Sequence, residues 1–104
     1  MSGGKKFDEG KLPYELISTV ALDEIVKVLG FGAEKYGRHN WRQGMRWSRL
    51  HGAALRHLTK HLNGESLDEE TNISHLAHAA CCLMFLLEYE LTGKGQDDRY
   101  KETP

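Results

Sequence analysis

The sequence predicts an all-α protein: a small bundle of three main helices plus a short helical turn, completed by oligomerisation. Apolar residues recur at helical spacing in residues 22–36 and 50–62, and residues 76–87 are apolar almost all round. Capping residues or glycines flank these stretches. A length of 104 residues leaves room for only one domain. We expect that domain over residues 14–92, after a flexible lead-in at 1–13 and before a polar tail at 93–104.

The first helix is predicted to begin at a cap formed by Ser18 or Thr19. Its apolar stripe consists of Leu22, Ile25, Val26, Leu29, Ala33 and Tyr36. Gly30 and Gly32 lie within this helix and should each cost it about 1 kcal/mol relative to alanine. We interpret these two glycines as positions where another backbone can approach closely.

The second helix is predicted over residues 49–62, with Ser48 as its cap and Asn63-Gly64 as its end. Its apolar stripe consists of Leu50, Ala54, Leu55, Leu58 and Leu62. His57 and His61 fall along one border of that stripe, where a side chain can reach a cleft without being buried in the core.

The third helix is predicted over residues 73–91 and ends near Gly93. Before it, Ser66 and Glu69 fit a capping box, which predicts a helical turn at 67–71. From Leu76 to Leu87 the helix is apolar nearly all round, so it must be covered on every side. We therefore expect it to be central and to form an oligomer interface as well. A strip of His75, His78, Cys82 and Tyr89 interrupts its apolar surface.

The composition excludes several partners. The formal net charge is −1, which gives no electrostatic footprint for nucleic acid or an anionic membrane. No apolar run is long enough to span a bilayer, and none follows the first residues as in a signal peptide. Cys81 and Cys82 are adjacent on a helix, which favours packing thiols over a disulfide. We expect no nucleic-acid partner, no membrane association and a cytoplasmic location.

Four of the six histidines lie in residues 56–78, as the pairs His57/His61 and His75/His78. Each pair falls on one face of a helix, and an acidic segment containing Glu65, Asp68, Glu69 and Glu70 separates them. Two such pairs facing each other across acidic residues could bind a divalent cation or a metal-bound phosphate ester. The alternative is a helical hairpin with half-buried histidines and a solvated acidic turn. Spacing alone leaves both interpretations open.

Residues 35–47 read as a loop that carries both tryptophans and the four cations Lys35, Arg38, Arg42 and Arg46. Trp41 and Trp47 either plug the edge of the core or stack on a planar ligand. Asn40 beside Trp41 would suit a flat, hydrogen-bonding base.

Carboxylate and imidazole ligands together favour Mg, Mn or another borderline divalent ion over structural zinc. The sequence has no zinc-finger spacing, glycine-rich phosphate loop or serine elbow. Metal-assisted hydrolysis is therefore the reaction class that the residues favour, with loop cations neutralising phosphate charge.

Several motifs resemble a known family. They are F-D-E-G-K at 7–11, F-G-A-E-K-Y-G-R-H-N-W at 31–41, W-S-R at 47–49, R-H-L-T-K-H-L-N-G-E-S-L-D-E-E at 56–70 and H-L-A-H-A at 75–79. The sequence is similar to the phage-encoded dATP/dGTP diphosphohydrolases of the MazZ type, which are related to the all-α MazG nucleotide pyrophosphatases. The resemblance implies a helical, oligomeric enzyme, a dimer or tetramer in the host cytoplasm. Such an enzyme cuts a nucleoside triphosphate between the α- and β-phosphates and requires Mg or Mn.

The chain departs from that family pattern at the metal ligands. MazG proteins use E-E-x-x-E on one helix and E-x-x-D on the next, whereas this chain offers Arg56-His57-x-x-Lys60 and His75-x-x-His78. We expect Glu65, Asp68 and Glu70 to hold the metal instead, with Glu34 as a further candidate.

The resulting hypothesis is a pyrophosphohydrolase of purine deoxynucleoside triphosphates, dGTP or dATP. Glu65, Asp68, His75 and His78 are its candidate catalytic residues. Lys35, Arg38 and Arg56 are the phosphate-binding candidates, Asn40 and Trp41 the base-binding candidates, and His57 and His61 are of second rank. One alternative is a His/Asp-metal phosphohydrolase that releases phosphate. The other is a non-catalytic helical interaction module of a phage.

Overall fold

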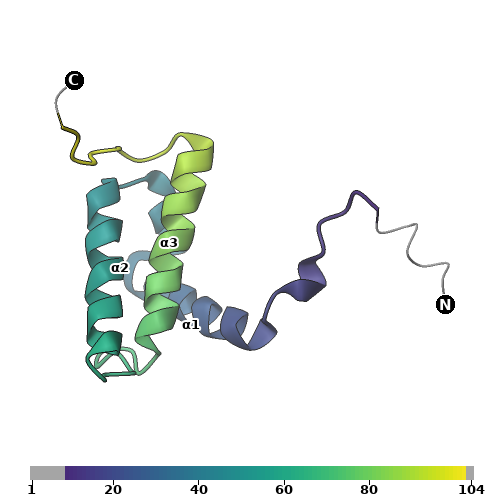
Figure 1. The fold of residues 1–104 in the computed structure, drawn as a ribbon, viewed down its shortest axis with the longest axis vertical. Helices are drawn as coiled ribbons and strands as arrows, with labels where there is room; N and C mark the ends of the chain where they lie inside the picture. Colours follow the sequence, from purple (N-terminus) through teal and green to yellow (C-terminus); the bar gives the residue numbers. More distant parts are fainter. Residues whose placement is uncertain (1–8, 103–104) are drawn as a thin grey trace.

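The computed structural model describes residues 9–102, and their order of elements is all-helical (Figure 1). A 3-10 turn, η2 (Tyr14–Leu16), precedes helix α1 (Thr19–Tyr36), and a second one, η3 (Asn40–Gln43), precedes α2 (Trp47–Leu62) and α3 (His75–Thr92). The described residues contain only isolated β-bridges and no strand. The prediction of an all-α fold with three main helices is confirmed. Residues 1–8 of the predicted lead-in lie outside the described part.

Helix α1 begins as the sequence predicts. The Ser18 hydroxyl accepts a hydrogen bond from the backbone N–H of Ala21 at 3.1 Å. The helix ends at Gly37, whose φ of 97° suits only glycine comfortably. A Cβ placed at Gly30 or Gly32 would meet no atom within 4 Å, so no other backbone of the described chain approaches these glycines.

Helix α2 begins one or two residues earlier than predicted, and Ser48 does not cap it. Arg46 is the N-cap residue, and Ser48 lies in the first turn. The Ser48 hydroxyl and backbone N–H both donate to the carboxylate of Asp98, at 2.5 and 2.9 Å. The prediction was wrong because residues 94–99 fold back over the start of α2, and sequence spacing does not reveal this contact.

The predicted capping box between Ser66 and Glu69 does not form, and residues 67–71 contain no helix. Asp68 closes a turn instead, because its Oδ1 atom accepts hydrogen bonds from the N–H groups of Glu70 and Thr71. A β-bridge between Leu67 and Ser74 joins the two ends of the loop.

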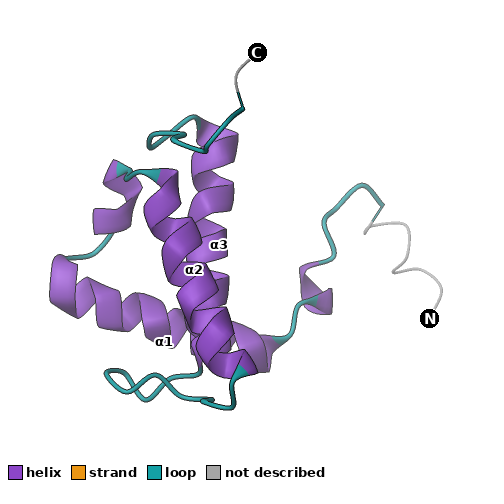
Figure 2. Ribbon diagram, turned by 60° about the vertical axis from the view of Figure 1, so that its left-hand side comes forward, coloured by secondary structure: helices purple, strands orange, loops and turns teal. Residues whose placement is uncertain are grey.

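Helix α3 begins two residues later than predicted, with Ser74 as its cap, and ends at Thr92 before Gly93. It packs antiparallel against α2, and α1 crosses it (Figure 2). α3 is therefore central among the described helices, as expected. The buried core is small: Leu50, Ala54, His75, Ala77, Ala79, Cys81 and Tyr89. None of the described helices combines the length and hydrophobicity needed to cross a lipid bilayer.

Many large apolar side chains of α2 and α3 remain exposed. They include Leu55, Leu58 and Leu62 on α2 and Leu76, Leu83, Leu87 and Leu91 on α3. Leu83 and Leu87 border a hollow of about 210 Å³ between the two helices. The apolar stripe of α2 is thus only partly used within the chain.

Residues 9–18 project away from the three helices as an arm, which is visible at the right of Figure 1. Leu12, Tyr14 and Leu16 on the arm are each at least 74% exposed. The arm contributes to a radius of gyration of 17.1 Å, whereas a compact domain of this length has a value of about 13 Å. Apolar residues on a projecting segment have no partner among the described residues of this chain.

Candidate functional site

Three histidines meet where α2 and the first turn of α3 lie side by side. His57 Nδ1 is 2.8 Å from His75 Nδ1, and the His57 ring stacks on that of His78 with centroids 4.6 Å apart. His75 is fully buried, whereas His57 and His78 are half-buried. We call His57, His75 and His78, with Glu65 and Asp68, the histidine cluster.

Glu65 determines where His75 carries its proton. Its Oε2 atom is 2.6 Å from His75 Nε2, and an ionised carboxylate can only accept a hydrogen bond. His75 Nε2 therefore donates, which leaves a lone pair on His75 Nδ1 when the ring is neutral. The contact between the two Nδ1 atoms is then a hydrogen bond donated by His57. A carboxylate behind a histidine is the arrangement that orients metal-binding imidazoles in proteins.

Burial keeps the other two rings neutral. Desolvation lowers the pKa of His57, and the nearby His78 and His75 lower it further. Desolvation also lowers the pKa of His78, against the opposing effect of Asp68. His78 Nε2 lies 2.7 Å from the Thr71 hydroxyl, which accepts a hydrogen bond from the Ile73 N–H. Neutral imidazoles can bind a metal ion or accept a proton at neutral pH.

Asp68 is ionised at the same place. Burial favours a higher pKa for its carboxyl group, but hydrogen bonds from the N–H groups of Thr71 and Glu70 hold the pKa below its ordinary value. Ligand atoms of His57, Asp68 and His75 all lie within 4.8 Å of one another. The three side chains come from α2, the loop and α3, so folding gathers a nitrogen-rich donor set around one carboxylate.

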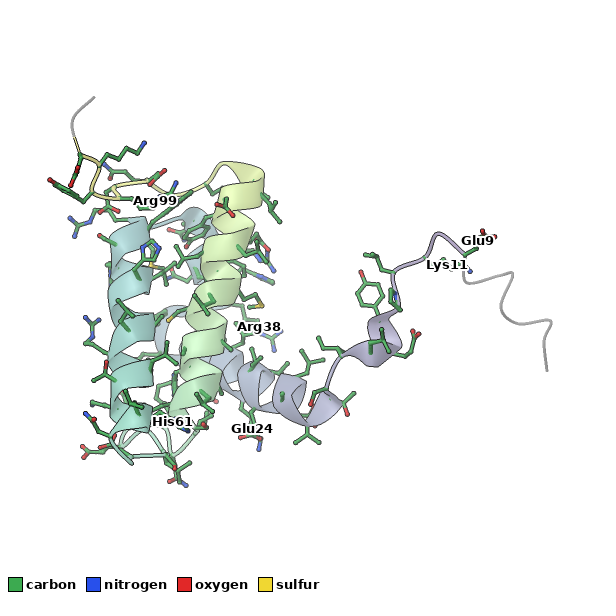
Figure 3. The ribbon with its side chains drawn as sticks, in the orientation of Figure 1. Glu9, Lys11, Glu24, Arg38, His61 and Arg99 are labelled. Carbon is green, nitrogen blue, oxygen red and sulfur yellow. The ribbon has the colours of Figure 1, made fainter. Side chains whose placement is uncertain are left out.

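The other predicted acids lie outside this group. Glu70 pairs with Lys35 at 3.0 Å, which ties the end of α1 to the loop at 63–74. Glu34 is exposed on α1 and does not join the group of potential ligands. His61 lies on the last turn of α2, beside that loop (Figure 3).

A cleft of about 740 Å³ opens between α1, the segment at 37–45 and α3. Arg38 lies on its rim beside α3 (Figure 3), and Asn40 and Trp41 contribute to its lining. Arg56 is elsewhere, because its guanidinium lies over Gly52 on α2. The structure therefore places the predicted base-binding residues and Arg38 in one cleft, whereas Lys35 pairs with Glu70 of the loop.

Both tryptophans pack against protein groups. Trp41 stacks on Phe85 with ring centroids 4.2 Å apart, and its carbonyl accepts a hydrogen bond from the buried Tyr89 hydroxyl. The Arg42 guanidinium lies 4.4 Å from the centre of the Trp41 ring and pairs with Glu88. The Trp47 indole N–H donates to the Lys94 carbonyl. Trp41 nevertheless lines the cleft, so packing does not remove it from the candidate site.

Sequence reasoning missed Thr71, Phe85 and Glu88. Thr71 reads as an ordinary turn residue, and Phe85 and Glu88 lie in a helix whose register against η3 is a tertiary property. His39 was also missed, because its special features are visible only in the structure. Its φ of 62° is left-handed, and it accepts a hydrogen bond from Arg42 Nε at 2.9 Å.

The fold and the site define an all-α domain with a histidine–carboxylate cluster beside an arginine-rimmed cleft. Residues 1–99 match the family model described as dATP/dGTP diphosphohydrolase, N-terminal, and the chain belongs to that family. It is also 42% identical over 96 residues to a curated protein of Salmonella phage PMBT28 named dATP/dGTP diphosphohydrolase. The resemblance predicted from the sequence motifs is confirmed.

The match covers 92% of this chain but only 33% of the phage protein. The chain thus spans about a third of the length of that relative. No solved structure matches the chain.

Proposed function

We propose that this chain forms the catalytic domain of a metal-dependent nucleoside triphosphate pyrophosphohydrolase. It would convert a (d)NTP and water into a (d)NMP and pyrophosphate, with dGTP and dATP as the preferred substrates. The observation that carries the proposal is the grouping of His57, Asp68 and His75 with Glu65 behind His75. Membership of the diphosphohydrolase N-terminal family supports the nucleotide as substrate.

The ligand atoms of the histidine cluster determine which metal ion fits the site. Mg prefers six oxygen ligands in octahedral geometry, whereas two imidazole nitrogens with one carboxylate suit Mn or another borderline ion. Of the two metals expected, Mg and Mn, we therefore propose Mn as the better fit. His57, His75 and Asp68 would hold the ion once the hydrogen bond from His57 to His75 Nδ1 is broken. The ion, when bound, would neutralise phosphate charge and polarise a phosphoryl oxygen. Glu65 would keep His75 oriented, as it does in this structure.

The remaining residues have roles that follow from their charge and protonation. Water attacks the α-phosphorus, the bond between that atom and the oxygen that bridges to the β-phosphate breaks, and pyrophosphate leaves. His78 is neutral and half-buried, so it is our candidate to accept the proton of that water. Lys35, which pairs with Glu70 of the loop, and Arg38, which lines the cleft, would neutralise the phosphates.

The decisive experiment is a product assay by anion-exchange chromatography. The protein is incubated with Mn or Mg and each common ribo- and deoxyribonucleoside triphosphate in turn. We expect monophosphate and pyrophosphate from dGTP or dATP, with a higher rate in Mn. Asp68→Asn should abolish turnover and Mn binding by calorimetry, because the amide keeps the turn-closing oxygen but loses the charge.

Glu69→Gln is the matched control, since Glu69 is the neighbouring exposed acid outside the cluster. It should retain wild-type turnover. Turnover that persists in Asp68→Asn would place the metal elsewhere. The absence of turnover with every triphosphate and either metal would favour a non-catalytic interaction module.

The same cluster also supports a second candidate. Two histidines and an aspartate as principal ligands suit a His/Asp-metal phosphohydrolase that releases inorganic phosphate. The product assay separates the two reactions, because the second one yields free phosphate in place of pyrophosphate.

We also propose that the protein works as a homo-oligomer, a dimer or tetramer. The exposed leucines of α2 and α3 are the support, since Leu83 and Leu87 are 53% and 55% exposed beside the hollow between these helices. Contiguous exposed apolar surface of this kind marks interfaces. A second copy of the chain is the occupant we propose, because it presents the same leucines to be covered.

A further inference from the structure

We infer that the cleft between α1 and α3 is the pocket for the purine base, and that the bare backbone of α1 at Gly30 and Gly32 forms one of its walls. The inference rests on the proposed nucleotide substrate and names the residues that would select its base. It adds a determinant of substrate size to a site otherwise defined by the histidine cluster.

The two glycines are not required by packing within the chain. Both lie inside α1, where glycine is less favourable than alanine. A Cβ at either position would meet nothing within 4 Å, and neither has a positive φ. Both nevertheless line the cleft. Because residues two apart on a helix point in nearly opposite directions, the two glycines leave peptide groups uncovered at two edges of the helix surface that lines the cleft. A flat ring can approach these edges more closely than it could approach a side chain.

The other residues that line the cleft match the base and the phosphates of a nucleotide. An aromatic region is formed by Trp41 stacked on Phe85, and such surfaces bind bases through their faces or edges. Of the described residues that line the cleft, three are arginines, Arg38, Arg42 and Arg49, and one is a glutamate, Glu88. Glu88 pairs with Arg42, and within residues 9–102 no carboxylate pairs with Arg38 or Arg49. The cleft therefore combines apolar walls with an excess of positive charge, as an anionic, ring-bearing ligand requires.

The position and size of the cleft agree with that occupant. Cys81, at the cleft, follows His78 of the histidine cluster by three residues on α3, a rise of about 4.5 Å. The Lys35–Glu70 ion pair joins the end of α1, which lines the cleft, to the loop that carries Asp68. A volume of about 740 Å³ is within the range of about 300–1,000 Å³ typical of small-molecule sites. A nucleotide with its base in the cleft would extend its phosphates toward the cluster.

The test compares two probes by calorimetry in the presence of Mn. One is a non-hydrolysable α,β-methylene analogue of dGTP, and the other is inorganic tripolyphosphate, which has no base. Gly32→Leu fills the cleft with a side chain, and Ala21→Leu places the same side chain on α1 outside it. We expect Gly32→Leu to weaken the analogue at least about tenfold, which corresponds to about 1.4 kcal/mol. Tripolyphosphate should bind equally well to all variants, and Ala21→Leu should match the wild type with both probes.

Alanine variants separate binding from folding. Gly32→Ala and Gly30→Ala both replace a helical glycine whose Cβ position is open space, so both should raise the melting temperature by a few degrees. A lower melting temperature for Gly32→Ala would overturn the claim that packing does not need this glycine.

Three outcomes would overturn the inference while leaving the proposed reaction intact. They are unchanged binding of the analogue by Gly32→Leu, equal weakening of both probes, and a change in sedimentation coefficient instead of affinity. The last would make the cleft an interface between protein chains. The proposed reaction itself fails in a different way, by the absence of turnover and of binding of either probe to the wild-type protein.

Discussion

At the scale of single residues, the hydrogen bonds of the histidine cluster depend on which imidazole nitrogens carry protons. Glu65 fixes the proton of His75 on Nε2, and His57 donates to the remaining nitrogen. His57 and His78 both have pKa values below the ordinary value of 6.5. Protonation of either would place a positive charge in a half-buried site against neighbouring imidazoles, so the structure favours the neutral form of these two rings.

The first prediction concerns pH. The unfolded chain binds protons on these histidines near pH 6.5, and the folded chain binds them only at lower pH. Between those values the unfolded state binds more protons, so the free energy of unfolding must fall as pH falls. Stability is complete above the unfolded pKa and is lost as pH drops through about 6.5 toward the folded values. The measurement is melting temperature against pH by circular dichroism.

His57→Asn should flatten this pH dependence, because it removes one of the two shifted groups. His51→Asn, on the same helix but outside the cluster, is the control and should keep the wild-type slope. Identical curves for wild type and His57→Asn would show that the cluster does not control stability in this range.

At the scale of elements, the start of α2 is held by a segment far away in sequence. Asp98 accepts two hydrogen bonds from Ser48, the Gln96 carbonyl accepts one from the Trp47 N–H, and the Arg99 guanidinium lies over the Trp47 ring at 5.0 Å. Figure 3 shows Arg99 at this end of α2, opposite His61. The carboxylate thus serves α2 as an N-cap supplied by the tail.

The second prediction follows from this contact. Asp98→Ala should lower the melting temperature, because the Ser48 N–H in the first turn of α2 loses its acceptor. Glu102→Ala, which removes an exposed tail carboxylate away from α2, should leave the melting temperature unchanged. Hydrogen exchange of the Ser48 amide is the local measurement. Unchanged protection of that amide in Asp98→Ala would contradict the assignment.

The elements also show what a sequence can and cannot reveal. Ser18, the glycines after the second and third helices and the apolar periodicity are local signals, and they predicted three helices whose stated ends lie within about two residues of the observed ones. Asp98 lies fifty residues from Ser48, so no local pattern indicates that it replaces Ser48 as the cap. The turn at 68–71 was assigned to Ser66 and Glu69 because their spacing fits a capping box. The Asp68 side chain instead accepts hydrogen bonds from the N–H groups of Glu70 and Thr71 and so forms a turn in place of the helix.

The candidate site, too, could be predicted only in part from the sequence. Spacing placed His75 and His78 on one face of a helix, and residue types indicated a metal. Which side chains meet depends on the register between α2 and α3, so the contact of His57 with His75 was not predictable from either helix alone. For the same reason, Glu70 was not expected to pair with Lys35, and Phe85 was not expected beneath Trp41.

At the scale of the whole molecule, the small core and the exposed leucines argue for assembly. The third prediction is that sedimentation velocity finds an oligomer whose dissociation is promoted by Leu83→Lys. Leu83 is 53% exposed, so a lysine there should leave the chain folded while placing a charge in the proposed interface. A stable interface buries about 800 Å² on each partner, which these leucines are well placed to supply.

Glu102→Lys adds positive charge in the tail and is the control for Leu83→Lys. It should not change the sedimentation coefficient. A monomeric wild-type protein over a wide concentration range would contradict the proposal. It would then assign the exposed leucines to another part of the longer proteins to which this chain is similar.

Helix α1 connects the projecting arm to the cleft. Its first turn follows the apolar arm, and its second half carries Gly30 and Gly32 at the cleft. Among the described helices it packs mainly on α3, so its angle to α3 sets the width of the cleft. If a second chain binds the arm, that contact restrains α1, which is also the helix that the nucleotide contacts. Assembly and nucleotide binding would then be thermodynamically linked, and each would change the affinity of the other by the same factor.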